Sequence, residues 1–385
     1  MEELEPTGLR LALAGGGTGG HVVPGTHLLR HLKGAGELES LVWFGAGRTA
    51  ERRALAGIED HLDAEVAFTK VDLPLESPAG GAPRFRDLAV RFAPATQRAR
   101  RALVEGKVQV VCGLGGFTCL PVVLAARSLR LPIALLEINA VQGKATRWLS
   151  PVCQRVLHAW PSTLPGPAHA ERETDKHRLI GPPLAPAFVE PALDEEERAR
   201  AVAKLAFDPS RPLILVLGGS QGAQALNRLM LDRNDEFTSC GLSILHQVGP
   251  GRLDEAGQAR EHYRAVEYVD DVAAALRAAS LVICRGGAST LAEVAAAGTP
   301  AVVVPYPHHR DAHQRANADA LGDGALVIEE ALGEDAIFSG AVGLVKNSSE
   351  LLRRGRVLRD AIPIGGAARL FEELSLLSTS RVSHD

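Results

Sequence analysis

The sequence lacks a strong excess of charge, since 42 lysines and arginines against 46 acids give a formal net charge of −4. A chain with this balance is not built to hold nucleic acid, so we exclude that partner. No stretch reaches the ~20 apolar residues that cross a bilayer. The acidic start, MEELEPTGLR, has no apolar leader segment. Any contact with a membrane is therefore expected to be peripheral.

Cysteine is scarce as well, and the five residues form no CxxC pair. Cys112 and Cys284 end the apolar runs VQVVC and LVIC, where buried thiols are expected. The odd count and the missing leader favour a reducing cytoplasm. A convincing DxD loop is also missing, because the acids of VDDV (269–272) open a predicted helix and are typical of its cap. We therefore expect no metal and no cofactor.

Apolar runs alternating with helical patterns are what the sequence does contain. A length of 385 residues favours two domains over one, at ~150 residues per domain. Continuous apolar runs separated by helices are typical of a parallel sheet covered on both faces. The strands expected in the first half are LRLALA (9–14), LVWF (41–44), VQVVC (108–112), PIALL (132–136) and RVLHA (155–159).

The same pattern restarts after a segment rich in proline and charge (160–191). The strands expected in the second half are PLILVL (212–217), SILHQV (243–248), LVIC (281–284) and PAVVVP (300–305). The sequence therefore predicts an α/β protein with an N-terminal domain at 1–175 and a C-terminal domain at 176–385. The last helix could pack back on the first domain.

Glycine loops follow the first strand of each half, at AGGGTGGHVVPG (14–25) and GGSQGA (218–223). Glycine lets backbone amides approach an anion, and the next helix adds its positive dipole. A tight turn without a ligand is the alternative. The second expected strand ends in LVWFGAGR, without the acid of a dinucleotide site, so NAD is not expected. CGLGGFT (112–118) is either a packing turn or a place where substrate approaches the backbone.

The segment RGGASTLAEVAAAG (285–298) is the most informative. Its helix begins near Ser289, and the carboxylate of Glu293 could accept both ribose hydroxyls of a nucleotide. The alternative is an acid that complements the helix dipole. The polar stretch PYPHHRDAHQ follows the next strand, where ligand-binding loops lie in open α/β sheets.

These motifs, with LLEINAVQGKATRWLS and DAHQRANA, occur in an order that resembles the MurG family from about Leu9 to Leu377. The resemblance implies a GT-B fold, in which two Rossmann-like domains face each other across a cleft. It implies an inverting, metal-independent transfer of N-acetylglucosamine from UDP-N-acetylglucosamine to undecaprenyl-pyrophosphoryl-N-acetylmuramoyl-pentapeptide (lipid I), which gives lipid II. It also implies a peripheral place on the cytoplasmic face of the membrane.

The resemblance assigns site residues. Ser220 matches a contact to the donor phosphates, Val269 to uracil and Glu293 to ribose, while Gln314 and Asn317 match contacts to the sugar hydroxyls. The full set of expected substrate contacts is Thr18, Gly19, Gly20, Asn139, Ser220, Gln221, Val269, Ala288, Ser289, Thr290, Leu291, Ala292, Glu293, Gln314 and Asn317. His21 and Glu137 are the candidate catalytic bases. The alternative for His21 is a donor to backbone or phosphate.

Three positions depart from the family pattern. Leu136 and Ile138 stand where the family has polar residues, and Ala185 stands where an arginine often helps to hold the nucleotide. Losing one charge-assisted hydrogen bond would weaken donor binding by roughly 1.5–3 kcal/mol. These departures motivate one alternative, a degenerate non-catalytic homologue. Two further alternatives are a GT-B transferase of UDP-sugars with another lipid or small-molecule acceptor, and a dinucleotide-dependent oxidoreductase.

The segment RFRDLAVRFAPATQRARRAL (84–103) combines arginines with Phe85, Leu88, Val90 and Phe92. This pattern is typical of a basic amphipathic helix lying on an anionic membrane surface. The alternative is an ordinary surface helix of the first domain.

Overall fold

The computed structural model describes residues 8–16, 19–48, 51–52, 55–73, 75, 85–166, 175–190, 192–257, 260–307 and 313–379. The chain divides into two compact units. Unit 1 comprises Met1–Pro186 and Gly365–Asp385, and unit 2 comprises Ala187–Ile364.

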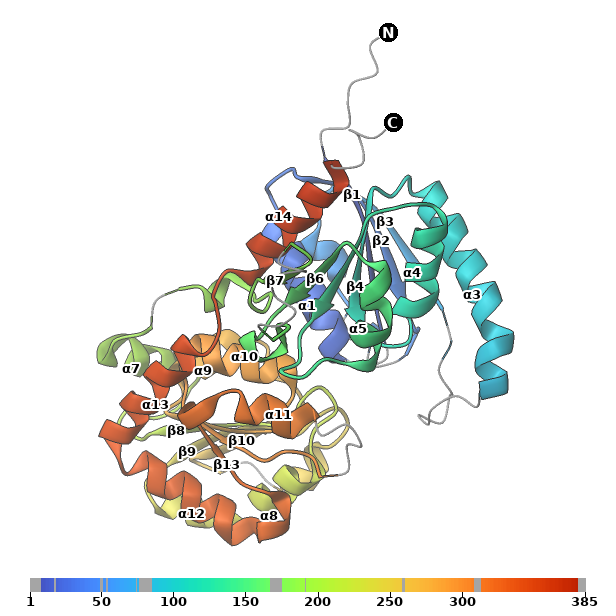
Figure 1. The fold of residues 1–385 in the computed structure, drawn as a ribbon. Coiled ribbons are helices and arrows are strands. Elements are labelled where there is room, and N and C mark those ends of the chain that lie inside the picture. Colours follow the sequence, from blue (N-terminus) through green and yellow to red (C-terminus); the bar gives the residue numbers. More distant parts are fainter. Residues whose placement is uncertain are drawn as a thin grey trace. The chain divides into compact units, whose positions relative to one another are not determined.

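Unit 1 contains a parallel sheet with the strand order β3-β2-β1-β4-β5-β6-β7. Its strands are β1 (Leu9–Gly15), β2 (Leu38–Gly45), β3 (Ala67–Asp72), β4 (Val110–Gly115), β5 (Ile133–Glu137), β6 (Arg155–His158) and β7 (His177–Leu179). Its helices are α1 (Gly19–Leu32), α3 (Phe85–Glu105), α4 (Cys119–Ser128), α5 (Lys144–Leu149) and α14 (Gly366–Thr379). Helices α3, α4 and α5 cover one face of this sheet, and α1 and α14 the other (Figure 1).

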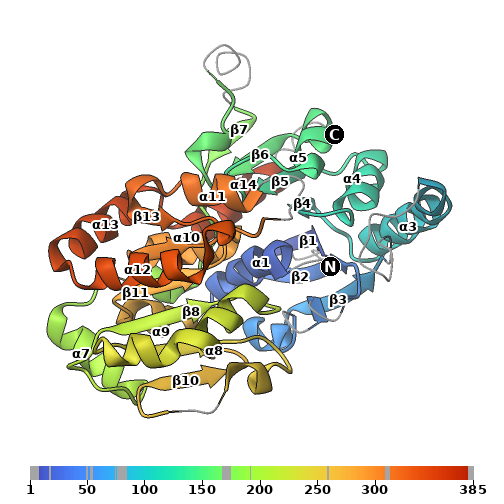
Figure 2. The same ribbon diagram turned by 90° about the horizontal axis from the view of Figure 1, so that it is seen from below.

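Unit 2 contains a second parallel sheet with the order β10-β9-β8-β11-β12-β13. Its strands are β8 (Leu213–Leu217), β9 (Ser243–Gln247), β10 (Tyr263–Val266), β11 (Leu281–Cys284), β12 (Ala301–Val303) and β13 (Ala325–Val327). Its helices are α7 (Glu195–Lys204), α8 (Gln224–Ser239), α9 (Val272–Ala278), α10 (Ala288–Ala297), α11 (His313–Asp319), α12 (Gly333–Val345) and α13 (Ser348–Asp360). Helices α8 and α12 lie on one face of this sheet, and α9 and α10 on the other (Figures 1 and 2).

The inner strands are apolar along their whole length because helices cover both of their faces. Every residue of β5, β8, β9 and β11 is buried. Cys112 and Cys284 have no exposed surface, which confirms that these two thiols are buried. All nine expected strands are present, and the α/β class is confirmed.

Four strands had no expected counterpart: β3, β7, β10 and β13. Each lies at an edge of its sheet. The sequence of β3, AFTKVD, has one buried residue, Val71, because an edge strand contacts the core through only part of its surface. Its apolar pattern is correspondingly weak, which explains why these strands escape a search for continuous apolar runs.

The division between the units falls after Pro186, beyond the predicted boundary after residue 175. Strand β7 follows that predicted boundary and nevertheless pairs with β6 in the first sheet. Helix α14 belongs to unit 1 and packs against α1. Its Arg369 donates from Nε to the Ile180 carbonyl oxygen at 2.7 Å. Gly366 permits this approach, because a Cβ there would lie 2.3 Å from the Pro182 carbonyl oxygen.

Candidate functional site

In each sheet the strand order reverses at one place, so that the connections following two neighbouring strands run to opposite faces of the sheet. In unit 1 this switch point lies between β1 and β4, and in unit 2 between β8 and β11. Ligands of open α/β sheets bind at the carboxyl ends of the strands at such points. The glycine loops of both halves lie there, as do the turns that begin α4 and α10.

His21 lies on the first turn of α1, at the switch point of unit 1. A Cβ on Gly115 would lie 2.7 Å from His21 Cδ2, and one on Gly116 would lie 3.2 Å from His21 Nδ1. The ring therefore packs on the backbone of the turn after β4. His21 Nδ1 lies 3.2 Å from the Gly16 carbonyl oxygen. Since a carbonyl oxygen only accepts, Nδ1 carries the hydrogen and Nε2 is the basic nitrogen of the neutral ring.

The thiol of Cys119 forms hydrogen bonds to the same turn. Its Sγ donates to the Ala14 carbonyl oxygen at 2.9 Å and accepts from the Gly115 backbone N–H at 3.2 Å. Burial raises the pKa of this thiol to about 12, so it stays protonated and able to donate. Cys119 thereby joins the carboxyl ends of β1 and β4, a role that nothing in the sequence indicated.

Glu137, the second candidate base, ends β5 and is 3% exposed. Its Oε1 accepts from the backbone N–H and the side-chain amide of Asn139 at 3.0 and 3.2 Å. Its Oε2 accepts from the Gly143 N–H at 2.7 Å and from Thr146 Oγ1 at 2.5 Å. Both oxygens thus fix the loop carrying Asn139 and the start of α5. This geometry suits a positioning role better than proton abstraction.

The departures at Leu136 and Ile138 are explained by burial, since these side chains are 2% and 6% exposed. Apolar side chains are stable there without hydrogen-bond partners. The loop that follows is held from the segment after β6. Trp160 Nε1 donates to the Ile138 carbonyl oxygen at 2.9 Å, and Ser162 Oγ donates to the Ala140 carbonyl oxygen at 2.7 Å. Asn139 itself is partly exposed.

In unit 2, Ser220 and Gln221 are exposed in the loop after β8. Two side chains hold this loop to the segment after β10. Gln247 Nε2 donates to the Gly219 carbonyl oxygen at 3.2 Å, and its Oε1 accepts from the Val269 N–H at 3.0 Å. Tyr268 Oη donates to the Ser220 carbonyl oxygen at 2.8 Å. The structure thus brings the expected phosphate and uracil contacts, Ser220 and Val269, into one hydrogen-bonded assembly.

Helix α10 carries the expected contacts at 288–293. Ala288, Leu291 and Ala292 are buried, whereas Ser289, Thr290 and Glu293 are partly exposed. Ser289 Oγ has no hydrogen-bond partner in the described part of the chain, although the atom is shielded from solvent. The polar members of the set are thus partly exposed as residues, and the apolar members pack the helix on its sheet.

Gln314 and Asn317, expected at the sugar hydroxyls, both hold Gly286 in the turn before α10. Gln314 Oε1 accepts from the N–H groups of Gly286 and Tyr306 at 3.2 and 2.9 Å. Asn317 Nδ2 donates to the Gly286 carbonyl oxygen at 3.1 Å, and this residue is 1% exposed. A Cβ on Gly286 would lie 2.2 Å from the Gln314 carbonyl oxygen, so only glycine allows α11 to come this close.

Arg285 is a buried cation beside that turn. It is 8% exposed, and its Nη1 donates to the Val304 carbonyl oxygen at 3.0 Å and lies 2.6 Å from Glu330 Oε2. The guanidinium thereby braces the segment after β12 that leads to α11. The sequence carries a signal for it, since Arg285 directly follows the apolar strand LVIC.

Two other histidines, His158 and His246, are buried in the sheets. His158 ends β6 and bonds Thr163 Oγ1 and His177, and burial followed by the nearby His177 lowers its pKa to about 4. His246 in β9 bonds the Tyr263 hydroxyl, and burial lowers its pKa to about 4 as well. Both rings are therefore neutral near pH 7, and they form part of the buried interior of their units.

Several expected features fall outside these clusters. Thr18 lies outside the described residues, and Gly19 and Gly20 are the first two residues of α1. Asp271 caps α9 by accepting from the Ala274 N–H at 2.9 Å, which confirms the helix-cap interpretation of its acid pair. Ala185 is 8% exposed in unit 1.

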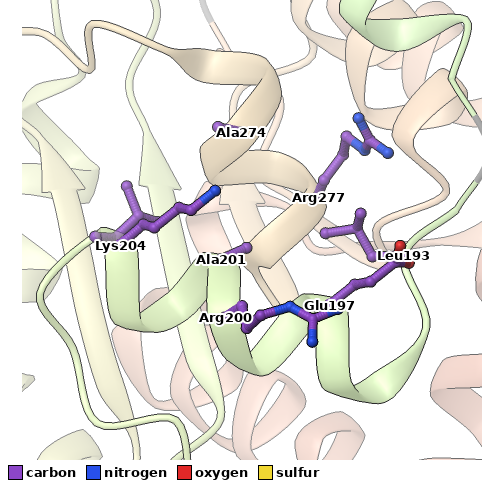
Figure 3. A pocket seen from close by; sticks show the side chains of 8 residues that line it. Leu193, Glu197, Arg200, Ala201, Lys204, Ala274 and Arg277 are labelled. Carbon is purple, nitrogen blue, oxygen red and sulfur yellow. The ribbon is translucent and has the colours of Figure 1, made fainter.

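A surface pocket of unit 2 lies between α7 and α9 (Figure 3). No expected site residue lines it. Two of its three basic side chains have acidic partners, Glu196 for Arg200 and Glu190 for Arg277. The lining residues are Leu193, Glu197, Arg200, Ala201, Lys204, Leu205, Ala274 and Arg277.

The chain is similar to known glycosyltransferases. Residues 11–158 match the glycosyltransferase family 28 N-terminal domain, and residues 213–336 match the glycosyltransferase family 28 C-terminal domain. The UDP-N-acetylglucosamine–N-acetylmuramyl-(pentapeptide) pyrophosphoryl-undecaprenol N-acetylglucosamine transferase of Clavibacter sepedonicus is 34% identical, over 96% of this chain and 97% of that protein. The protein of the same name from Sorangium cellulosum (strain So ce56) is 37% identical, over 84% and 76%.

Among solved structures, MurG of Acinetobacter baumannii superposes with a TM-score of 0.71 at 25% identity, covering 96% of this chain and 99% of that one. With the two parallel α/β sheets, this similarity confirms the expected GT-B class.

Proposed function

The chain belongs to the family of UDP-N-acetylglucosamine–N-acetylmuramyl-(pentapeptide) pyrophosphoryl-undecaprenol N-acetylglucosamine transferases, and from this premise we propose that it moves N-acetylglucosamine from UDP-N-acetylglucosamine to lipid I. The observation that carries the proposal is the carboxyl edge of the second sheet. Four segments there carry Ser220, Val269, the start of α10 and, on α11, Gln314, each after a different strand. A nucleotide-sugar needs such separate contacts for phosphate, base, ribose and sugar.

We assign donor binding to unit 2. Exposed Ser220 and the amides at the start of α8 would face the diphosphate, because helix N-termini stabilise negative charge. Ser289 Oγ adds a hydroxyl without a partner in the described residues. Glu293, partly exposed on α10, would accept the ribose hydroxyls. The departing UDP would be stabilised by these fixed dipoles.

We assign proton abstraction to His21 in unit 1. Its Nδ1–H donates to the Gly16 carbonyl oxygen, which leaves Nε2 as the basic nitrogen. The ring packs on Gly115 and Gly116, which limits its motion. In the proposed step Nε2 takes the proton of the acceptor hydroxyl while the oxygen attacks the anomeric carbon and the bond to UDP breaks. In this proposal Glu137 is a positioning residue, because its carboxylate holds Asn139 and the loop after β5.

The test uses the full chain with UDP-N-acetylglucosamine and a lipid I analogue. We expect the glycosylated lipid as product, and we expect Glu293→Gln to raise the KM for the donor. Glu261→Gln is the matched control, because its side chain is 88% exposed and lies outside the site. Turnover with another acceptor, combined with none on lipid I, would contradict the proposed acceptor.

We further propose that unit 1 contacts an anionic membrane surface through α3. Ala95, Ala99 and Leu103 of this helix are buried against the sheet. The rest of the helix surface exposes Arg91, Arg98, Arg100 and Arg101, and these arginines have no acidic partner within the described residues. The side chains of Phe85, Leu88 and Val90 lie outside the described part of the chain, so the arginines carry this proposal.

Exposed apolar side chains on the neighbouring helices add to the same proposal. Trp148 of α5 is 60% exposed, Leu124 of α4 is 41% exposed, and Val141 before α5 is 40% exposed. Helix α4 packs against both α3 and α5. Aromatic and aliphatic side chains next to arginines suit the headgroup region of a bilayer. None of the helices within the described ranges is long and apolar enough to span a membrane.

Vesicle sedimentation tests the membrane proposal. Partitioning onto phosphatidylglycerol-containing vesicles should fall by about thirtyfold in the double variant Arg98→Gln/Arg101→Gln, at ~1 kcal/mol per arginine. Arg200→Gln/Arg228→Gln in unit 2 removes two arginines whose side chains are 58% and 75% exposed, and should change little. Equal losses in both double variants would show that only net charge matters.

A further inference from the structure

A relay of hydrogen bonds runs from β7, at the edge of the first sheet, to the turn Pro161–Thr163. His158 and His177 lie on the paired strands β6 and β7, and His158 Nε2 lies 2.8 Å from His177 Nδ1. On the other side of the ring, His158 Nδ1 lies 2.8 Å from Thr163 Oγ1. The Thr163 hydroxyl in turn lies 2.9 Å from the Trp160 carbonyl oxygen. His158 has no exposed surface, whereas His177 is partly exposed.

The Trp160 carbonyl, at the end of the relay, determines where the hydrogens lie. It only accepts, so the Thr163 hydroxyl uses its single hydrogen there. The Thr163 oxygen must then accept from His158 Nδ1–H. Burial, followed by the nearby His177, lowers the pKa of His158 to about 4, so this ring is neutral near pH 7 and its Nε2 accepts. His177 therefore donates through Nδ1–H.

The segment at the end of the relay holds the loop after β5 on both sides of Asn139. Trp160 Nε1 donates to the Ile138 carbonyl oxygen at 2.9 Å. Ser162 Oγ donates to the Ala140 carbonyl oxygen at 2.7 Å. Trp160 is 1% exposed, so losing its bond would leave a buried N–H without a partner. Asn139 is thus fixed between two held carbonyls.

Thr163 contacts the same loop through its backbone. Gln142 Nε2 donates to the Thr163 carbonyl oxygen at 3.1 Å. The side chain of Thr163 meets His158 and its main chain meets the loop, so this residue connects the two. Loops at the carboxyl ends of parallel strands form the ligand sites of open α/β sheets, and the loop lies directly after β5. The histidine pair is therefore connected to the site edge of unit 1.

We propose that His158 and His177 are positioning residues: the hydrogen on His177 Nδ1 fixes Thr163 through His158 and thereby sets the place of Asn139 in the site. The inference rests on the proposed function, in which Asn139 contacts the substrates. Neither histidine exchanges a proton with a substrate, since both act through the turn. The site requires the hydrogen bond and not the charge of either ring.

Matched pairs of variants separate the hydrogen bonds from the shapes of the side chains. His177→Asn keeps an N–H donor at the place of Nδ1–H, whereas His177→Leu leaves the buried His158 Nε2 without that donor. Thr163→Ser keeps the hydroxyl, and Thr163→Val replaces it by a methyl group of similar size. His262→Asn and His262→Leu are the controls, because His262 adjoins the edge strand β10 of unit 2 and its side chain is 24% exposed.

The first readout is steady-state transfer from UDP-N-acetylglucosamine to the lipid I analogue. We expect His177→Leu and Thr163→Val to lower kcat by about tenfold, because a displaced contact residue orients the reactants poorly. The matched variants His177→Asn and Thr163→Ser should stay within about threefold of wild type, since they keep the hydrogen bonds. Both His262 variants should match wild type.

The second readout is the tautomer of the His158 ring, which is measured without any substrate. Proton–nitrogen correlation NMR spectra near pH 7 should show the hydrogen of His158 on Nδ1, with the resonances assigned by comparison with His158→Gln. The same tautomer should persist in His177→Asn. This measurement therefore tests the relay independently of the reaction.

Wild-type kcat in His177→Leu would overturn the inference. An equally low kcat in His177→Asn and His177→Leu would overturn it too, since a merely structural histidine is not rescued by a donor. A hydrogen on His158 Nε2 would contradict the order of the relay. Should His177→Leu fail to fold, the Thr163 pair and the tautomer decide. A wild-type chain that transfers no sugar, although His158 carries its hydrogen on Nδ1, would instead refute the proposed function.

Discussion

The two units use the same architecture but hold their switch-point turns by different means. In unit 1 an imidazole, His21, packs on the glycine turn after β4. In unit 2 the corresponding turns are held by the neutral side-chain amides of Gln247, Gln314 and Asn317. An imidazole titrates near neutral pH, whereas an amide does not. This difference matches the proposed division of roles, in which unit 1 carries the proposed base and unit 2 the proposed donor contacts.

The largest expected effect concerns His21 itself. His21→Ala should lower kcat by about 100-fold to 10,000-fold, because a positioned base contributes that much. His31→Ala, at an exposed position on the same helix, is the control and should leave kcat unchanged. Steady-state transfer to the lipid I analogue measures both. A small effect of His21→Ala would remove the chemical distinction between the units.

The second-largest effect is expected at Gly115, on which the His21 ring packs. Gly115→Ala places a Cβ 2.7 Å from His21 Cδ2, at a φ of 110°, and should displace the ring. We expect kcat to fall by about tenfold to a hundredfold. Gly34→Ala controls for backbone strain, since Gly34 has a φ of 80° with no neighbouring atom within 4 Å. Both variants should lose roughly 1–2 kcal/mol of stability, and equal kcat values would contradict a positioned ring.

Lowering the pH should reduce the stability of both units, because each contains a buried histidine with a lowered pKa, His158 in unit 1 and His246 in unit 2. The folded-state pKa values of His158 and His246 are lowered to about 4, below the ordinary 6.5. The stability they contribute is complete above pH 6.5 and is lost as the pH falls from 6.5 towards 4, because the unfolded chain binds the protons. At pH 5.5 each should cost about 1.4 kcal/mol.

Urea unfolding at pH 7.5 and 5.5 measures this loss. His246→Gln should reduce the pH dependence of the unit 2 transition only, since His158 lies in unit 1. An unaltered pH dependence in that variant would show that His246 does not titrate as its burial requires.

The smallest effect tests the hydroxyl of Tyr268. Tyr268→Phe loses one hydrogen bond to the Ser220 carbonyl oxygen and should raise the donor KM by about fivefold. In combination with Gln247→Met the effects should not add, because both side chains hold the same loop. Strict additivity of the two free-energy changes would mean that the loop is held at independent points.

The sequence predicted the inner strands well and the sheet edges poorly. Strands such as β8 and β11 are buried on both faces, so their apolar runs are continuous and visible. Strands β3, β7, β10 and β13 lie at the edges, where partial exposure permits polar residues. The domain boundary was predicted too early in the chain because edge strand β7 was not recognised and its segment was interpreted as a connection between the domains.

The site shows a similar limit. Resemblance assigned Asn317, and Glu137 was a candidate base, but their hydrogen bonds to the Gly286 turn and to the loop after β5 depend on atoms brought together by folding. Gln247 had no sequence signal beyond its place at the end of a strand, because an amide gains its role only from the two backbone groups it meets. Leu136 and Ile138 were departures in sequence and are ordinary buried residues in the structure.

The α/β class and the order of the glycine turns could be predicted from the sequence, because apolar runs and glycine positions are local properties of the chain. The family followed from the resemblance of its motifs. Only the tertiary structure decided that α14 belongs with unit 1, that His21 packs on Gly115, and that Gln247 connects the Gly219 and Val269 loops. These relations join residues distant in sequence, and hydrogen-bond distances exist only once both partners are folded into place.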